Sequence, residues 1–224
     1  MDYTLTDVNT RHEQILNWCK NNKVFYLKAD ILIPEAVENE VQEIYNNHLF
    51  TEHRSSDGRG WSSATLHGEE WNITHWDASK KDTFKWTKLA DYAPEMTRWL
   101  KDDFPNNGRY SRCRFMLLSP GGYIRAHTDT HQWQEGQPVK FDLYGALNIC
   151  ITQPSNCYLR REEDKQEVPF KPREVYWFDN GPHHSAANFS RENRFHFIVH
   201  GGGNKARKEL FIRSFEKSYP DADI

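Results

Sequence analysis

The chain has 224 residues, enough to bury one sizeable core, and no Gly/Ser-rich or Pro-rich stretch divides it, so a single domain is expected. Its 29 Lys and Arg stand against 32 Asp and Glu, and a net charge of −3 excludes the strongly basic surface with which proteins bind nucleic acid or anionic membranes. No apolar run approaches the roughly 20 residues of a membrane-spanning helix, and the first residues lack the pattern of a secretory signal, so a soluble, cytoplasmic protein is expected.

The first half of the chain, residues 1–109, is expected to supply helices and outer strands around the core. A short β-like run, Val24–Leu27, lies between two stretches whose apolar residues recur at helical spacing. Charged residues, serines and glycines over residues 51–62 indicate a surface loop. The helical pattern predicts three helices, over Val8–Asn22, Pro34–Leu49 and Pro94–Asp103.

Residues 110–201 have a different sequence pattern, in which short β-prone runs are separated by Gly, Pro, Asn and Asp. Several close strands with turn signals between them favour a mainly β sandwich or small barrel with flanking helices over an alternating β/α sheet. In the last segment, residues 202–224, a helix over Asn204–Lys217 is expected either to cover the core or to form a dimer face, and the oligomeric state is left open. Strands are expected over Cys113–Leu118, Tyr123–His127, Phe141–Thr152, Cys157–Arg161, Glu174–Phe178 and Arg194–Val199.

The sequence from Ser119 to Asp129 carries the first indication of chemistry. Side chains two apart in a strand share a face, so His127 and Asp129 can direct an imidazole and a carboxylate to one point. A third ligand must come from a distant strand, and His184 is the favoured candidate, with its neighbour His183 as the alternative. Two imidazoles and one carboxylate, with positions left open, form the facial arrangement of non-haem Fe(II) oxygenases.

A 2-oxo acid that chelates iron also needs a fixed cation for its distal carboxylate. Arg194 stands at the head of an expected strand, where alternation turns its side chain inward, and a planar guanidinium suits a two-point contact with a carboxylate. Arg191 is the alternative, although its neighbours Ser190, Glu192 and Asn193 are typical of a solvated turn.

These motifs resemble the aspartyl/asparaginyl β-hydroxylase family of 2-oxoglutarate oxygenases, which also includes free-proline hydroxylases. The resemblance runs from about Arg112 to Gly201, less than half of the chain. Its hallmarks appear as Ser119-Pro120-Gly121 ahead of His127, the run Leu147–Thr152, the tripeptide Trp177-Phe178-Asp179, and the string His184, Asn188 and Arg194.

The resemblance implies a double-stranded β-helix, the cupin-like jelly roll, with Fe(II) near one mouth of the barrel. It implies that His127 and His184 are metal ligands, that Arg194 grips the C5 carboxylate of 2-oxoglutarate, and that Asn148 approaches the other end of this co-substrate, although relatives often carry histidine there. Asp129 would complete the triad. The implied reaction takes O₂ and 2-oxoglutarate, hydroxylates an amino acid or an amino-acid residue of a peptide, and releases succinate and CO₂.

Three further side chains are candidates for substrate contact: Arg125 on the same strand face as His127, His131 shortly after Asp129, and Trp61 upstream. Each has a plain structural alternative, respectively a surface ion pair, a surface histidine and a buried aromatic. Two other classes of function stay open, namely a metal-dependent isomerase or hydrolase on the same barrel and a binding module without turnover. Succinate formation that depends on Fe(II) would separate these classes from an oxygenase.

Overall fold

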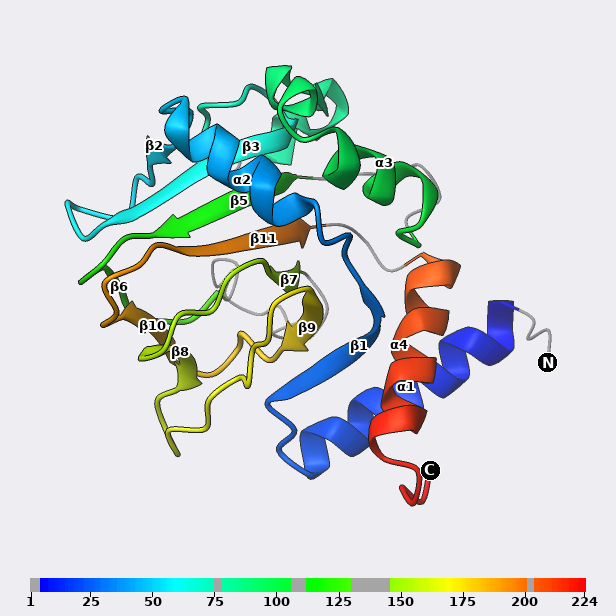
Figure 1. Cartoon of the computed structure of the whole chain (residues 1–224). Coiled ribbons are helices and arrows are strands. Elements are labelled where there is room, and N and C mark those ends of the chain that lie inside the picture. Colours follow the sequence, from blue (N-terminus) through cyan, green and yellow to red (C-terminus); the bar gives the residue numbers. More distant parts are fainter. Residues whose placement is uncertain (1–4, 75–77, 106–111, 130–145, 201–203) are drawn as a thin grey trace.

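The computed structural model describes residues 5–74, 78–105, 112–129, 146–200 and 204–224, and its backbone is built around two antiparallel sheets (Figure 1). Within these ranges the large sheet has the strand order β1-β9-β7-β11-β5-β3-β2, with β4 paired to β3. The small sheet has the order β6-β10-β8. The strands are β1 Tyr26–Leu32, β2 Thr51–Glu52, β3 Trp61–Gly68, β4 Lys85–Trp86, β5 Cys113–Leu118, β6 Tyr123–His127, β7 Ala146–Cys150, β8 Cys157–Arg161, β9 Glu174–Phe178, β10 His184–Asn188 and β11 Arg194–His200.

Alternation along the strands of the large sheet divides its side chains between two hydrophobic cores. Leu117 and Trp177 join the larger core, which is shared with the helices, whereas their neighbours Leu118 and Tyr176 join a second core. The second core also receives Ala186 from the small sheet, so it fills the space between the two sheets. Two antiparallel sheets that enclose a common interior form a jelly roll, which confirms the predicted double-stranded β-helix.

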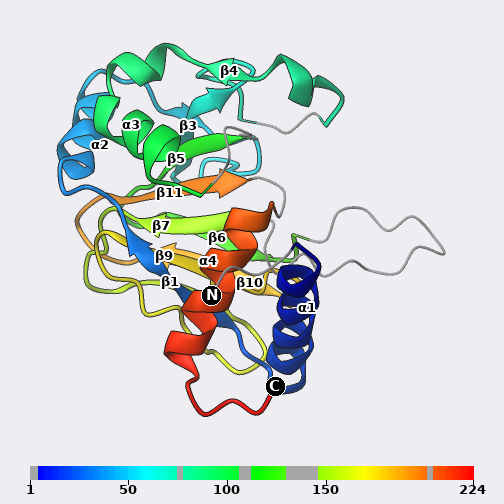
Figure 2. The ribbon, with the colours of Figure 1, turned by 90° about the vertical axis from the view of Figure 1, so that its right-hand side faces the viewer.

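Helices cover the outer face of the large sheet. The chain forms α1 over Leu5–Asn21, α2 over Val37–Asn46, α3 over Pro94–Asp102 and α4 over Lys205–Ser218, with 3-10 turns η1 over Ala78–Thr83 and η2 over Lys88–Asp91. Figure 2 shows α1 and α4 side by side next to β1, and both pairs of contacts, α4 with α1 and α4 with β1, are present. Among the described residues, no helix combines the length and the apolar character that crossing a bilayer requires.

The C-terminal helix serves as core cover, one of its two expected roles. Asn204 caps it, because the Asn204 side-chain oxygen accepts a hydrogen bond from the Arg207 backbone N–H at 2.9 Å. Phe211 is 2% exposed and its ring meets that of Trp177 edge-on, with centroids 5.1 Å apart. The apolar stripe of α4 is therefore buried within the chain itself.

Three of the differences between the predicted elements and the structure concern stretches whose structure was predicted otherwise. The predicted β-like run Val24–Leu27 begins and ends too early in the chain, since β1 begins at Tyr26 and continues to Leu32 by pairing with β9. Residues 51–62 are not wholly a loop, because Thr51–Glu52 pairs with β3, which itself begins at Trp61. Of the expected strand Phe141–Thr152, residues 141–145 lie outside the described ranges and the remainder forms β7 to Cys150.

Candidate metal centre and co-substrate site

Two histidines face each other across neighbouring strands of the small sheet. His127 ends β6, His184 begins β10, and the two are direct partners in the antiparallel register. Their ring centroids lie 4.5 Å apart. The His184 side chain is buried and packs edge-on against Phe178 of the inter-sheet core, whereas the His127 side chain is 38% exposed. The pair therefore spans from the barrel interior to its surface.

Asp129 completes a three-residue cluster with these histidines. One ligand atom from each of His127, Asp129 and His184 can be chosen so that all lie within 4.8 Å of one another. The Nε2 atom of His127 is 3.3 Å from Asp129 Oδ1, and the Nε2 atom of His184 is 3.9 Å from Asp129 Oδ2. The structure thus brings together the three residues that the sequence selected as metal ligands.

Backbone hydrogen bonds orient both imidazoles in the same way. The Nδ1 atom of His127 lies 2.8 Å from the carbonyl oxygen of Arg125, and that of His184 lies 3.0 Å from the carbonyl oxygen of Pro182. Since a carbonyl only accepts, each Nδ1 carries a hydrogen, so each Nε2, once it carries no proton, presents its lone pair to a metal.

The surroundings of Asp129 in the cluster favour the ionised form of its carboxyl group. Burial alone would raise the pKa of Asp129, but the hydrogen bond with His127 and the nearby histidines outweigh it, and the net pKa is lowered. The same hydrogen bond raises the pKa of His127, whereas burial lowers the pKa of His184. Asp129 is accordingly ionised at neutral pH and ready to bind a cation. Two imidazole nitrogens and one carboxylate oxygen are the donor set of non-haem Fe(II) centres, so the residues fit this ion.

Arg194 lies buried at the head of β11, with 5% of its surface exposed. Its Nε donates to Gln153 Oε1 at 2.9 Å, and its guanidinium lies over the Phe170 ring, 5.4 Å from the centroid. Burial lowers the pKa of Arg194 to about 10, so the group stays charged at neutral pH. Its Nη2 is buried and has no hydrogen-bond partner among the described residues. A buried cation with an unused donor is suited to an anionic ligand.

Asn188 links the ligand strand to the strand that carries Arg194. It is fully buried at the end of β10, and its amide donates to the carbonyl oxygens of Leu118 and Glu192, each at 2.8 Å. These bonds tie β10 to β5 and to the turn that precedes Arg194. The string of His184, Asn188 and Arg194 in the sequence is therefore one connected structural unit.

A second group of buried basic side chains lies near the metal cluster and was not among the predicted site residues. Arg112 lies just before β5 and Arg114 lies on it, and they are 8% and 6% exposed. Burial lowers the pKa of both, to about 10 for Arg112, and the nearby charge of Asp129 offsets part of this lowering. Arg114 Nη1 donates to the carbonyl oxygen of Thr74 at 3.2 Å, whereas its Nε has no hydrogen-bond partner within the described ranges. Burial, then the charges of these arginines, lower the pKa of His53 to about 3, so His53 is neutral.

The sequence does contain an indication of this group. Arg112 and Arg114 stand two residues apart in an otherwise apolar run, and alternation along a strand directs both side chains to one face. Gln153, the partner of Arg194, had no such signal, since it lies in the connection after β7.

Two of the remaining sequence candidates, Asn148 and Trp61, are packed within the fold. Asn148 is buried on β7, where its register partners are Ile198 of β11 and Tyr176 of β9. Trp61 stacks on His53 with ring centroids 3.7 Å apart. Arg125 is exposed on β6, and His131 lies outside the described residues. The two alternatives, His183 and Arg191, are both exposed.

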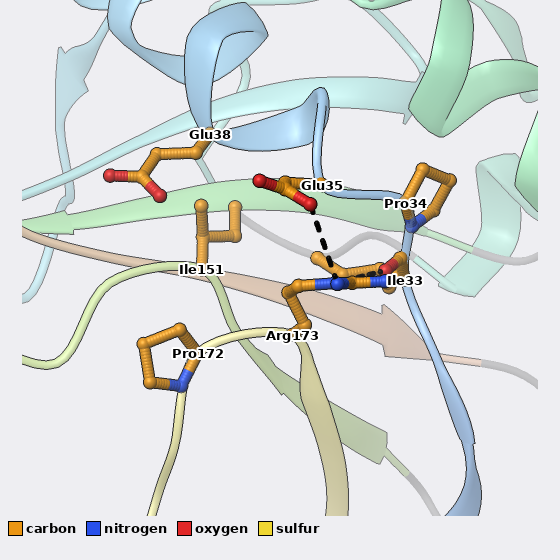
Figure 3. Close-up of a pocket in the computed structure, with 7 residues that line it drawn as sticks. All are labelled: Ile33, Pro34, Glu35, Glu38, Ile151, Pro172 and Arg173. Atoms are coloured by element: carbon orange, nitrogen blue, oxygen red, sulfur yellow. Dashed lines mark hydrogen bonds and ion pairs between the residues drawn. The ribbon is translucent and has the colours of Figure 1, made fainter.

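A cavity of about 240 Å³ lies apart from these residues, near the start of α2 and the start of β9. Figure 3 shows Arg173 at its wall, where Nε donates to the carbonyl oxygen of Ile33 at 3.0 Å and Nη1 lies 3.7 Å from Glu35 Oε2. Its lining contains none of the metal-cluster residues. It consists of Ile33, Pro34, Glu35, Glu38, Ile151, Pro172 and Arg173.

Comparison with protein-family models identifies a family for the chain. The family model described as aspartyl/asparaginyl beta-hydroxylase matches residues 34–201, well over half of the chain. A search of curated protein sequences returned no match.

Several solved structures are similar to the chain at low sequence identity. One is a prolyl hydroxylase from Trichoplax adhaerens in complex with a hypoxia-inducible-factor peptide fragment, with 13% identity, 92% of this chain and 96% of that chain covered, and a TM-score of 0.47. Another is a viral collagen prolyl hydroxylase from Paramecium Bursaria Chlorella virus-1 in complex with 2-oxoglutarate, with 11% identity, 79% and 94% covered, and a TM-score of 0.45. A prolyl-4-hydroxylase from Pseudomonas putida has 14% identity, 80% and 93% covered, and a TM-score of 0.42.

Proposed function

Since the chain belongs to the aspartyl/asparaginyl beta-hydroxylase family and is a hydroxylase, we propose that it hydroxylates an amino acid whose carboxylate is free, with Fe(II), 2-oxoglutarate and O₂. One observation carries the proposal: ligand atoms of His127, Asp129 and His184 converge within 4.8 Å in a barrel that also buries the cation of Arg194. When bound, the iron supplies the oxidative chemistry that converts 2-oxoglutarate to succinate and CO₂ and places one oxygen atom on the substrate.

The chain's own contribution begins with holding the ion. His127 and His184 would bind it through Nε2, because each Nδ1 is occupied by a backbone carbonyl. Asp129 would provide the third ligand and one negative charge. A carboxylate and two imidazoles leave coordination positions open for the co-substrate and O₂.

Arg194 would bind the C5 carboxylate of 2-oxoglutarate. Gln153 holds its Nε, so Nη2 remains to donate to the incoming carboxylate. The apolar ring of Phe170 beneath the guanidinium excludes water from this contact and strengthens the charge interaction. Asn148 would meet the other end of the co-substrate. It lies on β7, two residues before Cys150, and the two side chains share one face of the strand.

The buried arginines near Asp129 support a substrate that carries its own carboxylate. Arg114 is buried on β5, its Nη1 donates to the neutral carbonyl oxygen of Thr74, and its Nε has no hydrogen-bond partner among the described residues. An internal peptide residue other than Asp or Glu has no carboxylate, whereas a free amino acid always carries one on its α-carbon. We therefore assign Arg114 to the substrate carboxylate, with Arg112 adding positive potential.

To test the proposal, purified protein is incubated with Fe(II), 2-oxoglutarate and a panel of free L-amino acids. Each amino acid is compared with its carboxamide and with an N-acetylated peptide that contains it internally. Succinate and the oxygenated product are measured by mass spectrometry. The proposal expects coupled succinate and product from at least one free amino acid and little from its two paired forms. Equal turnover of the carboxamide or peptide would refute the free carboxylate, and no Fe(II)-dependent succinate with any partner would refute the oxygenase.

A further inference from the structure

The turn between β9 and β10 makes a two-point contact with Asp129. The Asp129 backbone N–H donates to the carbonyl oxygen of Asn180 at 3.1 Å, and the Asn180 side-chain amide donates to Asp129 Oδ2 at 3.4 Å. Asp129 lies beyond the end of β6, where the small sheet no longer fixes its backbone. The contact with Asn180 therefore holds both the main chain and the side chain of this residue.

The turn that presents Asn180 is itself fixed at its preceding residue. Asp179 donates its backbone N–H to the carbonyl oxygen of Phe25 at 2.6 Å, and its carboxylate accepts from the Gly181 backbone N–H at 3.0 Å. The second bond closes a local side-chain turn of the kind that aspartate favours. With Asp179 committed to the turn, the Asn180 side chain is left to point toward Asp129.

Asn180 differs from the other contacts of Asp129 because it does not belong to the proposed ligand set. The nearby side chains of His127 and His184 approach Asp129 through Nε2, the atoms that would bind the ion. Once an ion occupies the site, those nitrogens are engaged with it. Among the described residues, Asn180 is then the side chain whose hydrogen bond to the Asp129 carboxylate persists.

We infer that Asn180 is a positioning residue that orients Asp129 for metal binding. The inference rests on the proposed metal site. An amide N–H on one carboxylate oxygen leaves the other available to the ion and restricts rotation of the carboxylate before the ion arrives. Asn180 also lies four residues before His184, so its contact joins the two segments that carry the three ligands. Aspartate at this position would accept instead of donating and would repel Asp129.

The test measures Mn(II) binding to metal-free protein by calorimetry, so it does not depend on turnover. Loss of a hydrogen bond to a metal-binding carboxylate typically weakens metal affinity about 10- to 100-fold. Asn180→Ala and Asn180→Asp are expected to raise the Kd for Mn(II) by roughly this factor, with Asn180→Asp at least as damaging as Asn180→Ala. Asn46→Ala, at an exposed asparagine on α2, is the matched control and leaves the Kd unchanged.

Two further measurements distinguish misfolding and failure of the metal site from failure of the role proposed for Asn180. The melting temperature of each metal-free variant reports folding, and only variants that melt with the wild type enter the comparison. His127→Ala is measured in parallel. If His127→Ala binds Mn(II) as well as the wild type does, the proposed metal site itself fails. If His127→Ala loses binding while Asn180→Ala and Asn180→Asp keep the wild-type Kd, the site stands and the role of Asn180 is refuted.

Discussion

His127 and His184 are direct register partners on adjacent antiparallel strands, and both direct Nδ1 to a carbonyl oxygen two residues earlier in the chain. The pairing of β6 with β10 therefore fixes the separation of the two rings, and the two carbonyl oxygens fix a hydrogen on each Nδ1. Because the strands also belong to the barrel wall, the position of both proposed ligands is determined by the fold before any ion binds.

The first prediction separates His184 from its neighbour. His184→Ala removes a buried proposed ligand, so Mn(II) binding to the metal-free protein is expected to fall below detection in calorimetry. His183→Ala is the matched control, since that side chain is exposed, and it is expected to bind Mn(II) like the wild type. The opposite pattern would make His183 the third ligand.

Arg194 provides the second prediction. Arg194→Met removes the buried cation proposed for the C5 carboxylate, and the loss of one partner of a buried charge pair costs about 2–5 kcal/mol. The KM for 2-oxoglutarate is therefore expected to rise roughly thirtyfold or more. Arg191→Met, at the exposed alternative, should leave this KM unchanged. A normal KM in Arg194→Met would remove Arg194 from the co-substrate site.

The third prediction concerns the substrate carboxylate. Arg114→Leu is expected to raise the KM for the amino-acid substrate at least tenfold while the KM for 2-oxoglutarate changes little, because only one of the two ligands loses its cation. Arg125→Leu, at an exposed arginine on β6, tests the sequence candidate for the same contact, for which a surface ion pair was the alternative. If Arg125→Leu raises the substrate KM and Arg114→Leu does not, the assignment passes to Arg125. Circular dichroism checks that Arg114→Leu remains folded.

The sequence predicts most of the barrel strands because their signals are local. The bounds of β5, β6, β8 and β9 agree with the expected runs, in which apolar residues are interrupted by turn residues. By contrast, β10 is His-Ser-Ala-Ala-Asn, a run of small and polar residues with little β propensity of its own. It becomes a strand because β6 and β8 pair with it on both sides. That information lies in distant segments, so no local pattern could reveal it.

The same distinction applies to the site. Strand alternation predicts that His127 and Asp129 share a face, but Asp129 lies beyond the end of β6 and its position is held by Asn180. The approach of His184 follows once β10 pairs with β6. The contacts of Gln153 with Arg194 and of Asn180 with Asp129 each join a loop to a residue far away in the chain. Loop residues carry no periodic pattern, and therefore their partners could not be predicted from sequence.

The fourth prediction concerns stability at low pH. Burial, then the charge of Lys208, lower the pKa of His12 from its ordinary 6.5 to about 4 in the folded protein. Between these values the unfolded chain binds a proton that the folded chain does not, so stability is full above pH 6.5 and is lost as pH falls toward 4.

From pH 7 to pH 5, His12 alone is expected to cost roughly 2 kcal/mol of the free energy of unfolding, measured by urea titration. His12→Phe should lose that much less than the wild type over the same interval. His48→Asn, at an exposed histidine, should follow the wild type. Equal pH slopes for His12→Phe and the wild type would contradict the role of His12.

The central claim is that one ion binds to His127, Asp129 and His184 while 2-oxoglutarate reaches from that ion to Arg194. Anomalous diffraction from crystals grown with Mn(II) and 2-oxoglutarate, without O₂, tests it most directly. The account predicts one strong manganese peak bonded to Nε2 of both histidines and to the Asp129 carboxylate, with the distal carboxylate of 2-oxoglutarate on the Arg194 guanidinium. A manganese peak away from these three side chains, or a 2-oxoglutarate whose distal carboxylate leaves Arg194 untouched, would contradict it.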